Sequence, residues 1–150
     1  MFTQRLIVAL IVGPVMLVAT YLGGWYFFIP ILFLMLVAGW EYANIMRVLG
    51  HKLPLGLLLP AIALILLGAW QPQLNLSGFA LFLGLFAGLI YCLSLFERGI
   101  TLDAALDWFA LVTGIVLLGW VGSHFFLLRG LPENGWQCTT VALMSIWSAD

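Results

Sequence analysis

Charged side chains are scarce in this sequence. Aspartate, glutamate, lysine and arginine together make up 7% of its 150 residues, whereas 65% of the residues are hydrophobic. A soluble domain is about one quarter charged and just under half apolar. A chain of this length could not bury so much apolar surface in a soluble core. The sequence therefore predicts an all-α fold, a polytopic transmembrane helical bundle with lipid as the solvent for most of the chain.

Several kinds of binding motif are also absent. The net charge is −1 and the charges are scattered, which excludes nucleic acid as a partner. Cys92 and Cys138 lie far apart and form no CxxC pair, so no structural zinc site is expected. The sequence has no P-loop, dinucleotide fingerprint or HExxH motif. Any chemistry must therefore depend on a few isolated polar residues.

Apolar runs separated by short polar or glycine-rich stretches predict the helices. Five runs are complete and a sixth reaches the last residue; they cover residues 6–22, 25–40, 55–70, 76–96, 108–128 and 136–150. About 17–25 apolar residues suffice to cross a bilayer as a helix. Gly23 and Gly24 predict a tight turn that makes an antiparallel hairpin of the first two helices. Gly84 and Gly88 form a small-xxx-small pattern that favours close helix packing.

The sixth run carries the chain toward a carboxylate, Asp150, where the sequence stops. A membrane segment that ends on an acid indicates a longer domain. We therefore interpret residues 1–150 as the N-terminal membrane portion of a single transmembrane domain that is truncated at its C-terminus. The partners that a carboxylate at membrane depth needs are then expected in the missing part.

The distribution of basic residues predicts the orientation. With the N-terminus in the cytoplasm, Arg5, Arg47, Lys52 and Arg98 all lie inside and Arg129 lies outside. Basic residues favour the cytoplasmic side of membrane helices. The sixth helix then runs inward, which brings Asp150 toward the cytoplasmic half.

Four acidic residues are candidates for a site. Asp150 can bind a divalent cation that coordinates a nucleotide phosphate. Alternatively, it is the first residue of a cytoplasmic loop and has no special role. Glu41 is better explained as marking the interface at the end of the second helix. Asp103 and Asp107, four residues apart, resemble a paired-carboxylate metal site. Acids near a helix start, with Thr101 as a cap, are the simpler explanation.

The two histidines carry less chemistry. His124 follows Ser123 in the fifth helix and is interpreted as a hydrogen-bonding packing residue, because no neighbouring acid completes a catalytic triad. His51, with Arg47 and Lys52, makes a small basic loop whose simplest explanation is contact with anionic headgroups.

Several stretches together resemble one enzyme family. GWVGSHFFLLR at residues 119–129, followed by a Leu-Pro loop and by IWSAD at residues 146–150, resembles phosphatidate cytidylyltransferase. YLGGW at residues 21–25 and WEY at residues 40–42 look like that family's first helices. The family's later segments, a Ser-Pro-Lys-Lys stretch and a signature rich in His, Gly, Asp and Arg, are not present in these residues.

The resemblance implies a membrane enzyme of phospholipid biosynthesis. Such enzymes make CDP-diacylglycerol and pyrophosphate from CTP and phosphatidic acid with magnesium, in the bacterial inner membrane. The match of Trp147 and Asp150 to the family's Trp-x-x-Asp motif implies that Asp150 binds the metal or the nucleotide. The catalytic residues are not implied by this portion, and a homo-oligomer is left open.

Two other functions remain open from the sequence. A related CTP-dependent polyprenol or phytol kinase would use an alcohol as the acceptor. A membrane scaffold or transporter subunit would carry out no catalysis.

Overall fold

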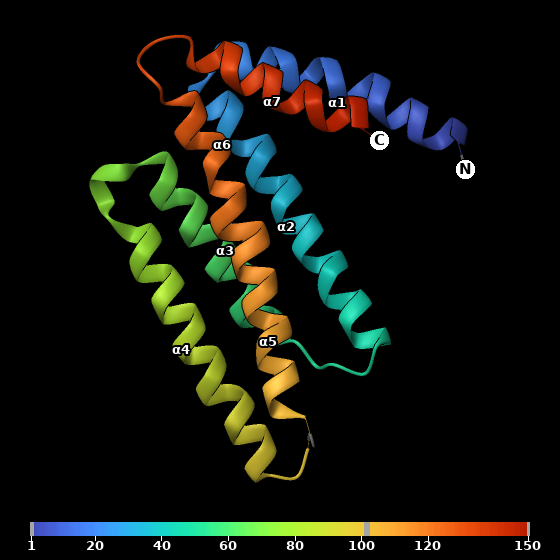
Figure 1. Ribbon diagram of the computed structural model, residues 1–150, viewed down its shortest axis with the longest axis vertical. Helices are drawn as coiled ribbons and strands as arrows, with labels where there is room; N and C mark the ends of the chain where they lie inside the picture. Colours follow the sequence, from blue (N-terminus) through green and yellow to red (C-terminus); the bar gives the residue numbers. More distant parts are fainter. Residues whose placement is uncertain (1, 101–102, 150) are drawn as a thin grey trace. The chain divides into compact units, whose positions relative to one another are not determined.

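The computed structural model describes the backbone of residues 2–100 and 103–149, and the side chains of residues 12–100 and 103–146 (Figure 1). Within these ranges every regular element is helical. The elements are α1 (Phe2–Leu22), α2 (Gly24–Val48), α3 (Leu55–Trp70), the 3-10 turn η1 (Pro72–Leu74), α4 (Leu76–Glu97), α5 (Ala104–Gly114), the π-helical segment η2 (Ile115–Val121), α6 (Gly122–Arg129) and α7 (Gly135–Ala149). The all-α prediction is confirmed.

Among the described residues, three helices are long and apolar enough to cross a membrane. They are α2, α4 and the continuous helix Ala104–Arg129, which α5, η2 and α6 form together. Most large apolar side chains on these helices are exposed, as lipid-facing side chains are. The chain therefore has the features of a membrane protein.

The helices divide into two compact units, Met1–Ile31 with Phe125–Asp150, and Leu32–His124. In the first unit α1 lies alongside α7 (Figure 1). The rings of Tyr21 and Trp136 meet edge to face, with their centroids 5.7 Å apart. Phe126 of α6 packs in the same way against Phe27, at a centroid distance of 5.6 Å. Aromatic contacts of this kind stabilise a core that has little polar bonding.

The turn between α1 and α2 is closed by an arginine. Gly23 and Gly24 have φ of +67° and +53°, which confirms the tight turn that the glycine pair predicts. Arg129 Nε donates a hydrogen bond to the Thr20 carbonyl at 2.8 Å, and Nη2 donates to the Tyr21 carbonyl at 3.3 Å. These carbonyls have no partner within the last turn of a helix, so Arg129 caps α1.

In the second unit α3 contributes more buried hydrophobic residues than any other described element. Leu58, Ile62, Ile65 and Leu66 are completely buried, and α3 packs against both α4 and η2. The bounds of α3 agree with the sequence prediction, because Pro54 precedes it and a Gln-Pro turn follows it. This helix is the central element of its unit.

Small residues bring α4 close to its neighbours. A Cβ at Gly84 would lie 3.2 Å from the Ala61 Cβ, and one at Gly88 would lie 2.5 Å from Leu111 Cδ2. The packing role that the small-xxx-small pattern indicates is therefore confirmed.

The contact between the end of α3 and the start of α4 is tighter still. Ser77 Oγ donates to the Ile65 carbonyl at 3.0 Å, and a Cβ at Gly68 would collide with the backbone nitrogen of Ser77.

We expect Gly68→Ala to lower the free energy of unfolding by about 1–3 kcal/mol, the range for overpacking a tight contact. The clash is with backbone, which cannot rotate away as a side-chain end can. Gly78→Ala is the matched control, because a Cβ there meets no atom within 4 Å. The measurement is the unfolding midpoint of each purified variant in mixed micelles. Equal midpoints for Gly68→Ala and wild type would contradict the close α3–α4 contact.

The end of α2 and the start of α5 are two of the helix boundaries that differ from the sequence prediction. α2 continues to Val48 rather than ending at Trp40, because no proline or glycine interrupts residues 41–48. α5 begins at Ala104, so Asp107 lies inside the helix rather than in a loop. Asp103 is the N-cap residue of α5, and Thr101, the cap that the sequence suggests, lies outside the described residues. Both errors have one cause: polar residues within a helix look like loop residues in a sequence.

Candidate functional site

His51 and Asp107 form a hydrogen-bonded pair between the α2–α3 loop and α5. His51 Nδ1 lies 2.8 Å from Asp107 Oδ1, although the two residues are 56 positions apart in the sequence. The Asp107 side chain is only 4% exposed, whereas the His51 side chain is 25% exposed. A carboxylate can only accept a hydrogen bond, so Nδ1 carries the proton and donates it. Asp107 therefore fixes both the tautomer and the orientation of the imidazole.

This pair changes two interpretations from the sequence. Asp107 is a buried hydrogen-bond partner rather than an acid that serves only the helix dipole. His51 is bonded within the protein, so headgroup contact alone does not explain it. Asp103, by contrast, is exposed at the start of the helix, so the two acids lie in different environments. No local sequence signal indicates a pair that only the tertiary fold brings together.

Tyr42 and Trp108 hold α5 in the position that the pair requires. Tyr42 Oη donates to the Ala110 carbonyl at 2.7 Å, which joins α2 to α5. Trp108 Nε1 donates to the Leu85 carbonyl at 3.1 Å, which joins α5 to α4. A Cβ at Gly114 would lie 2.7 Å from Tyr42 Cε1, so glycine is needed there for the tyrosine to pack.

Glu41 precedes Tyr42 but does not mark a helix end. It lies within α2, seven residues before Val48, and its side chain is exposed. The prediction that Glu41 lies at the end of the second helix is therefore wrong, whereas its place at the membrane interface stays a prediction. The physical reason is the continuation of α2 beyond Trp40.

His124 lies on α6 and bonds locally. Its Nδ1 lies 2.9 Å from the Trp120 carbonyl, and its ring meets the Trp120 ring edge to face at a centroid distance of 6.3 Å. The neighbouring Ser123 is buried and donates to the same carbonyl at 2.6 Å. This carbonyl lies in the π-helical η2, where wide winding leaves backbone oxygens available to side chains. His124 is thus a hydrogen-bonding residue, as the sequence suggests.

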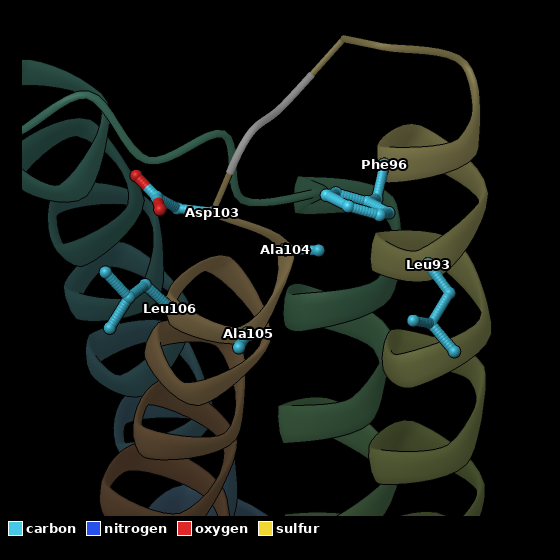
Figure 2. A pocket seen from close by; sticks show the side chains of 6 residues that line it. All are labelled: Leu93, Phe96, Asp103, Ala104, Ala105 and Leu106. Atoms are coloured by element: carbon cyan, nitrogen blue, oxygen red, sulfur yellow. The ribbon is translucent and has the colours of Figure 1, made fainter.

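A pocket of about 310 Å³ lies where α4 ends and α5 begins (Figure 2). It is lined by Leu93, Phe96, Asp103, Ala104, Ala105 and Leu106. Figure 2 shows the Asp103 carboxylate directed away from Leu93 and Phe96. The lining contains no cationic side chain, so this pocket does not suit the phosphates of a nucleotide.

The predicted metal ligand, Asp150, lies outside the described residues, as do the side chains of Trp147, Ser148 and Ala149. Among the described residues there is no group of three or more His, Cys, Asp or Glu that could hold a metal ion. Magnesium prefers several oxygen ligands in octahedral geometry. The described part of the chain therefore does not fit a complete magnesium site.

Residues 3–150 match the model of the cytidylyltransferase family, which is almost the whole chain. The chain belongs to this family. The family includes CDP-diacylglycerol synthase, in agreement with the resemblance of residues 119–129 and 146–150. No curated protein and no solved structure matches the chain. Family membership, together with the membrane-spanning helices, places the chain among CTP-dependent transferases with membrane helices.

Proposed function

We propose that the protein transfers the cytidylyl group of CTP to phosphatidic acid and so makes CDP-diacylglycerol for phospholipid biosynthesis. The observation that carries the proposal is the family match over residues 3–150, in a chain whose described residues include three helices long and apolar enough to cross a membrane. An enzyme embedded in lipid can reach an acceptor that is itself a lipid, while CTP arrives from water. An oxygen of the lipid phosphate attacks the α-phosphorus of CTP, and the bond to the β-phosphate breaks to release pyrophosphate.

The reaction needs charge neutralisation and alignment of the attacking oxygen. We propose that Asp150 contributes to the first of these by binding Mg²⁺, as the Trp-x-x-Asp motif at residues 147–150 implies. The described residues offer few cations for the phosphates, since Arg129 caps α1. We therefore also propose that other phosphate-binding groups lie in a part of the protein outside residues 1–150.

The position of the phosphorus label distinguishes this reaction from that of a lipid kinase. Membranes from cells that express the whole open reading frame containing residues 1–150 are incubated with phosphatidic acid, or with a polyprenol, and with CTP labelled at either the α- or the γ-phosphate. We expect the α-label to enter the lipid in the presence of phosphatidic acid. Transfer of the γ-label to the polyprenol would instead identify a CTP-dependent alcohol kinase. If neither label is transferred to a lipid, the remaining alternative is a membrane scaffold or transporter subunit without catalytic activity.

The topology of the proposed enzyme is a separate prediction. We expect the N-terminus in the cytoplasm of a bacterial cell, with the α2–α3 and α4–α5 loops on the same side because of the positive-inside rule. The His51–Asp107 pair supports a common side for the two loops. In a background with Cys92→Ala and Cys138→Ser, Lys52→Cys should react with an impermeant maleimide only from the cytoplasmic face. Asn134→Cys is the control for the opposite face, and labelling of position 52 from outside would refute the orientation.

A further inference from the structure

We propose that the last turn of α2 and the following α2–α3 loop bind the phosphate of an anionic lipid through Arg47, His51 and Lys52, with Asp107 as the residue that positions His51. The lipid is a phosphomonoester, and its identification with phosphatidic acid rests on the proposed function. Three features of the second unit support the proposal: the backbone of the loop, the hydrogen bond of His51 to Asp107, and the charge of the segment.

The loop backbone is fixed by the end of α2. The Gly50 N–H donates to the Arg47 carbonyl at 3.1 Å, and the His51 N–H donates to the Met46 carbonyl at 2.9 Å. Gly50 has a φ of +95°, a backbone conformation that residues with a side chain rarely adopt. This pattern of glycine-based bonds closes a helix C-terminus and holds the following residue in place. His51 therefore leaves the helix in a defined direction.

The imidazole is fixed as well, because Nδ1 donates to the buried carboxylate of Asp107. Nε2 is then the hydrogen-bonding atom of the ring that is left for an external partner. When the ring is protonated, Nε2 becomes an N–H donor, and the carboxylate compensates the positive charge of the imidazolium. A donor held at both its backbone and its ring loses little conformational entropy when it binds a ligand.

The charge of the segment selects a phosphate. Arg47 and Lys52 are exposed on either side of His51, and the sequence has no acidic residue between Glu41 and Glu97. The acids that approach from α5 are Asp107, which is paired with His51, and Asp103 at the start of that helix. A phosphomonoester carries up to about two negative charges and three acceptor oxygens. A zwitterionic diester headgroup offers less negative charge and an ammonium that the two cations repel.

The test is the binding of short-chain phosphatidic acid to the purified protein in nanodiscs of phosphatidylcholine, measured by titration at two salt concentrations. We expect His51→Gln to weaken binding roughly tenfold, the loss typical of one charge-assisted hydrogen bond. Arg47→Gln with Lys52→Gln should weaken it at least as much and reduce its dependence on salt. Asp107→Asn keeps an acceptor for Nδ1 and should give a smaller loss than His51→Gln.

Two variants are matched controls. His124→Gln removes the chain's other histidine, and Arg98→Gln removes a cation from the neighbouring α4–α5 loop. Each should change the dissociation constant less than twofold. If His51→Gln does not fold, the double variant of Arg47 and Lys52 decides alone, because both side chains are exposed. Unchanged affinity in the double variant would overturn the proposal.

Further measurements test the identity of the ligand separately from the proposed reaction. If inorganic phosphate displaces bound phosphatidic acid as effectively as unlabelled phosphatidic acid does, the site binds free phosphate. That result would refute the assignment of a lipid as the ligand. The binding measurement uses no CTP, so it does not depend on catalysis. Normal cytidylyl transfer with unchanged lipid affinity in the variants would contradict this inference alone. Lipid binding that depends on His51, without any cytidylyl transfer, would contradict the proposed reaction alone.

Discussion

Asp150→Asn is expected to reduce cytidylyl transfer roughly a thousandfold or more while the protein still inserts into the membrane. Asparagine keeps the size and much of the hydrogen bonding of aspartate but lacks the negative charge that a magnesium ion requires. Loss of a charge contact at a metal costs on the order of several kcal/mol of transition-state stabilisation. Each 1.36 kcal/mol corresponds to about a factor of ten in rate.

The measurement is incorporation of α-labelled CTP into lipid by membranes from cells that express the complete open reading frame. Glu41→Gln makes the same chemical change at an exposed position within α2 and should have a much smaller effect. The two variants are compared at equal amounts of protein in the membrane. Near-normal incorporation by Asp150→Asn would remove Asp150 from the site and make it an ordinary loop residue.

A second large effect is expected when residues 1–150 are expressed alone. We predict no CDP-diacylglycerol above the level of a reaction without protein. Transfer between two phosphorylated substrates needs several cationic groups. The chain has five lysines and arginines, and Arg129 is committed to the carbonyls of Thr20 and Tyr21. The described residues also include no group of acids and histidines that could hold a metal ion.

The complete open reading frame, purified in the same detergent, is the positive control for this experiment. Circular dichroism of the 150-residue chain establishes that it is folded and helical, so that lack of activity is not due to misfolding. Steady conversion of CTP and phosphatidic acid by this chain would show that its own residues suffice. The proposal that further phosphate-binding groups lie elsewhere would then be wrong.

The fold could be predicted where apolar runs end at strong helix breakers. Pro54 and the Gln-Pro turn define α3, and the glycine pair at Gly23 defines the first turn. Prediction failed at the C-terminal end of α2 and at the start of α5, where helices continue through polar residues. The π-helical winding of residues 115–121 has no signature in the sequence, because it depends on how the helix packs.

The candidate site was less predictable than the fold. The sequence marks His51 as part of a basic loop and Asp107 as an acid near a helix start, but 56 positions separate them and no local pattern joins them. Tyr42 was noted as part of a family-like WEY stretch, whereas its hydrogen bond to Ala110 became evident only in the structure. Motifs indicate which residues belong to a family, but partners across a bundle depend on helix packing.

The length and burial of α3 have a consequence for the match between the protein and the bilayer. Its 16 residues span about 24 Å, less than the roughly 30 Å hydrocarbon core, and its only exposed residues are Gly56, Pro60 and Leu64. Few lipid tails can therefore contact the short helix. Hydrophobic mismatch is instead set by longer helices such as α4, whose 22 residues span about 33 Å. The preferred membrane thickness of this unit should accordingly follow α4 and be insensitive to the length of α3.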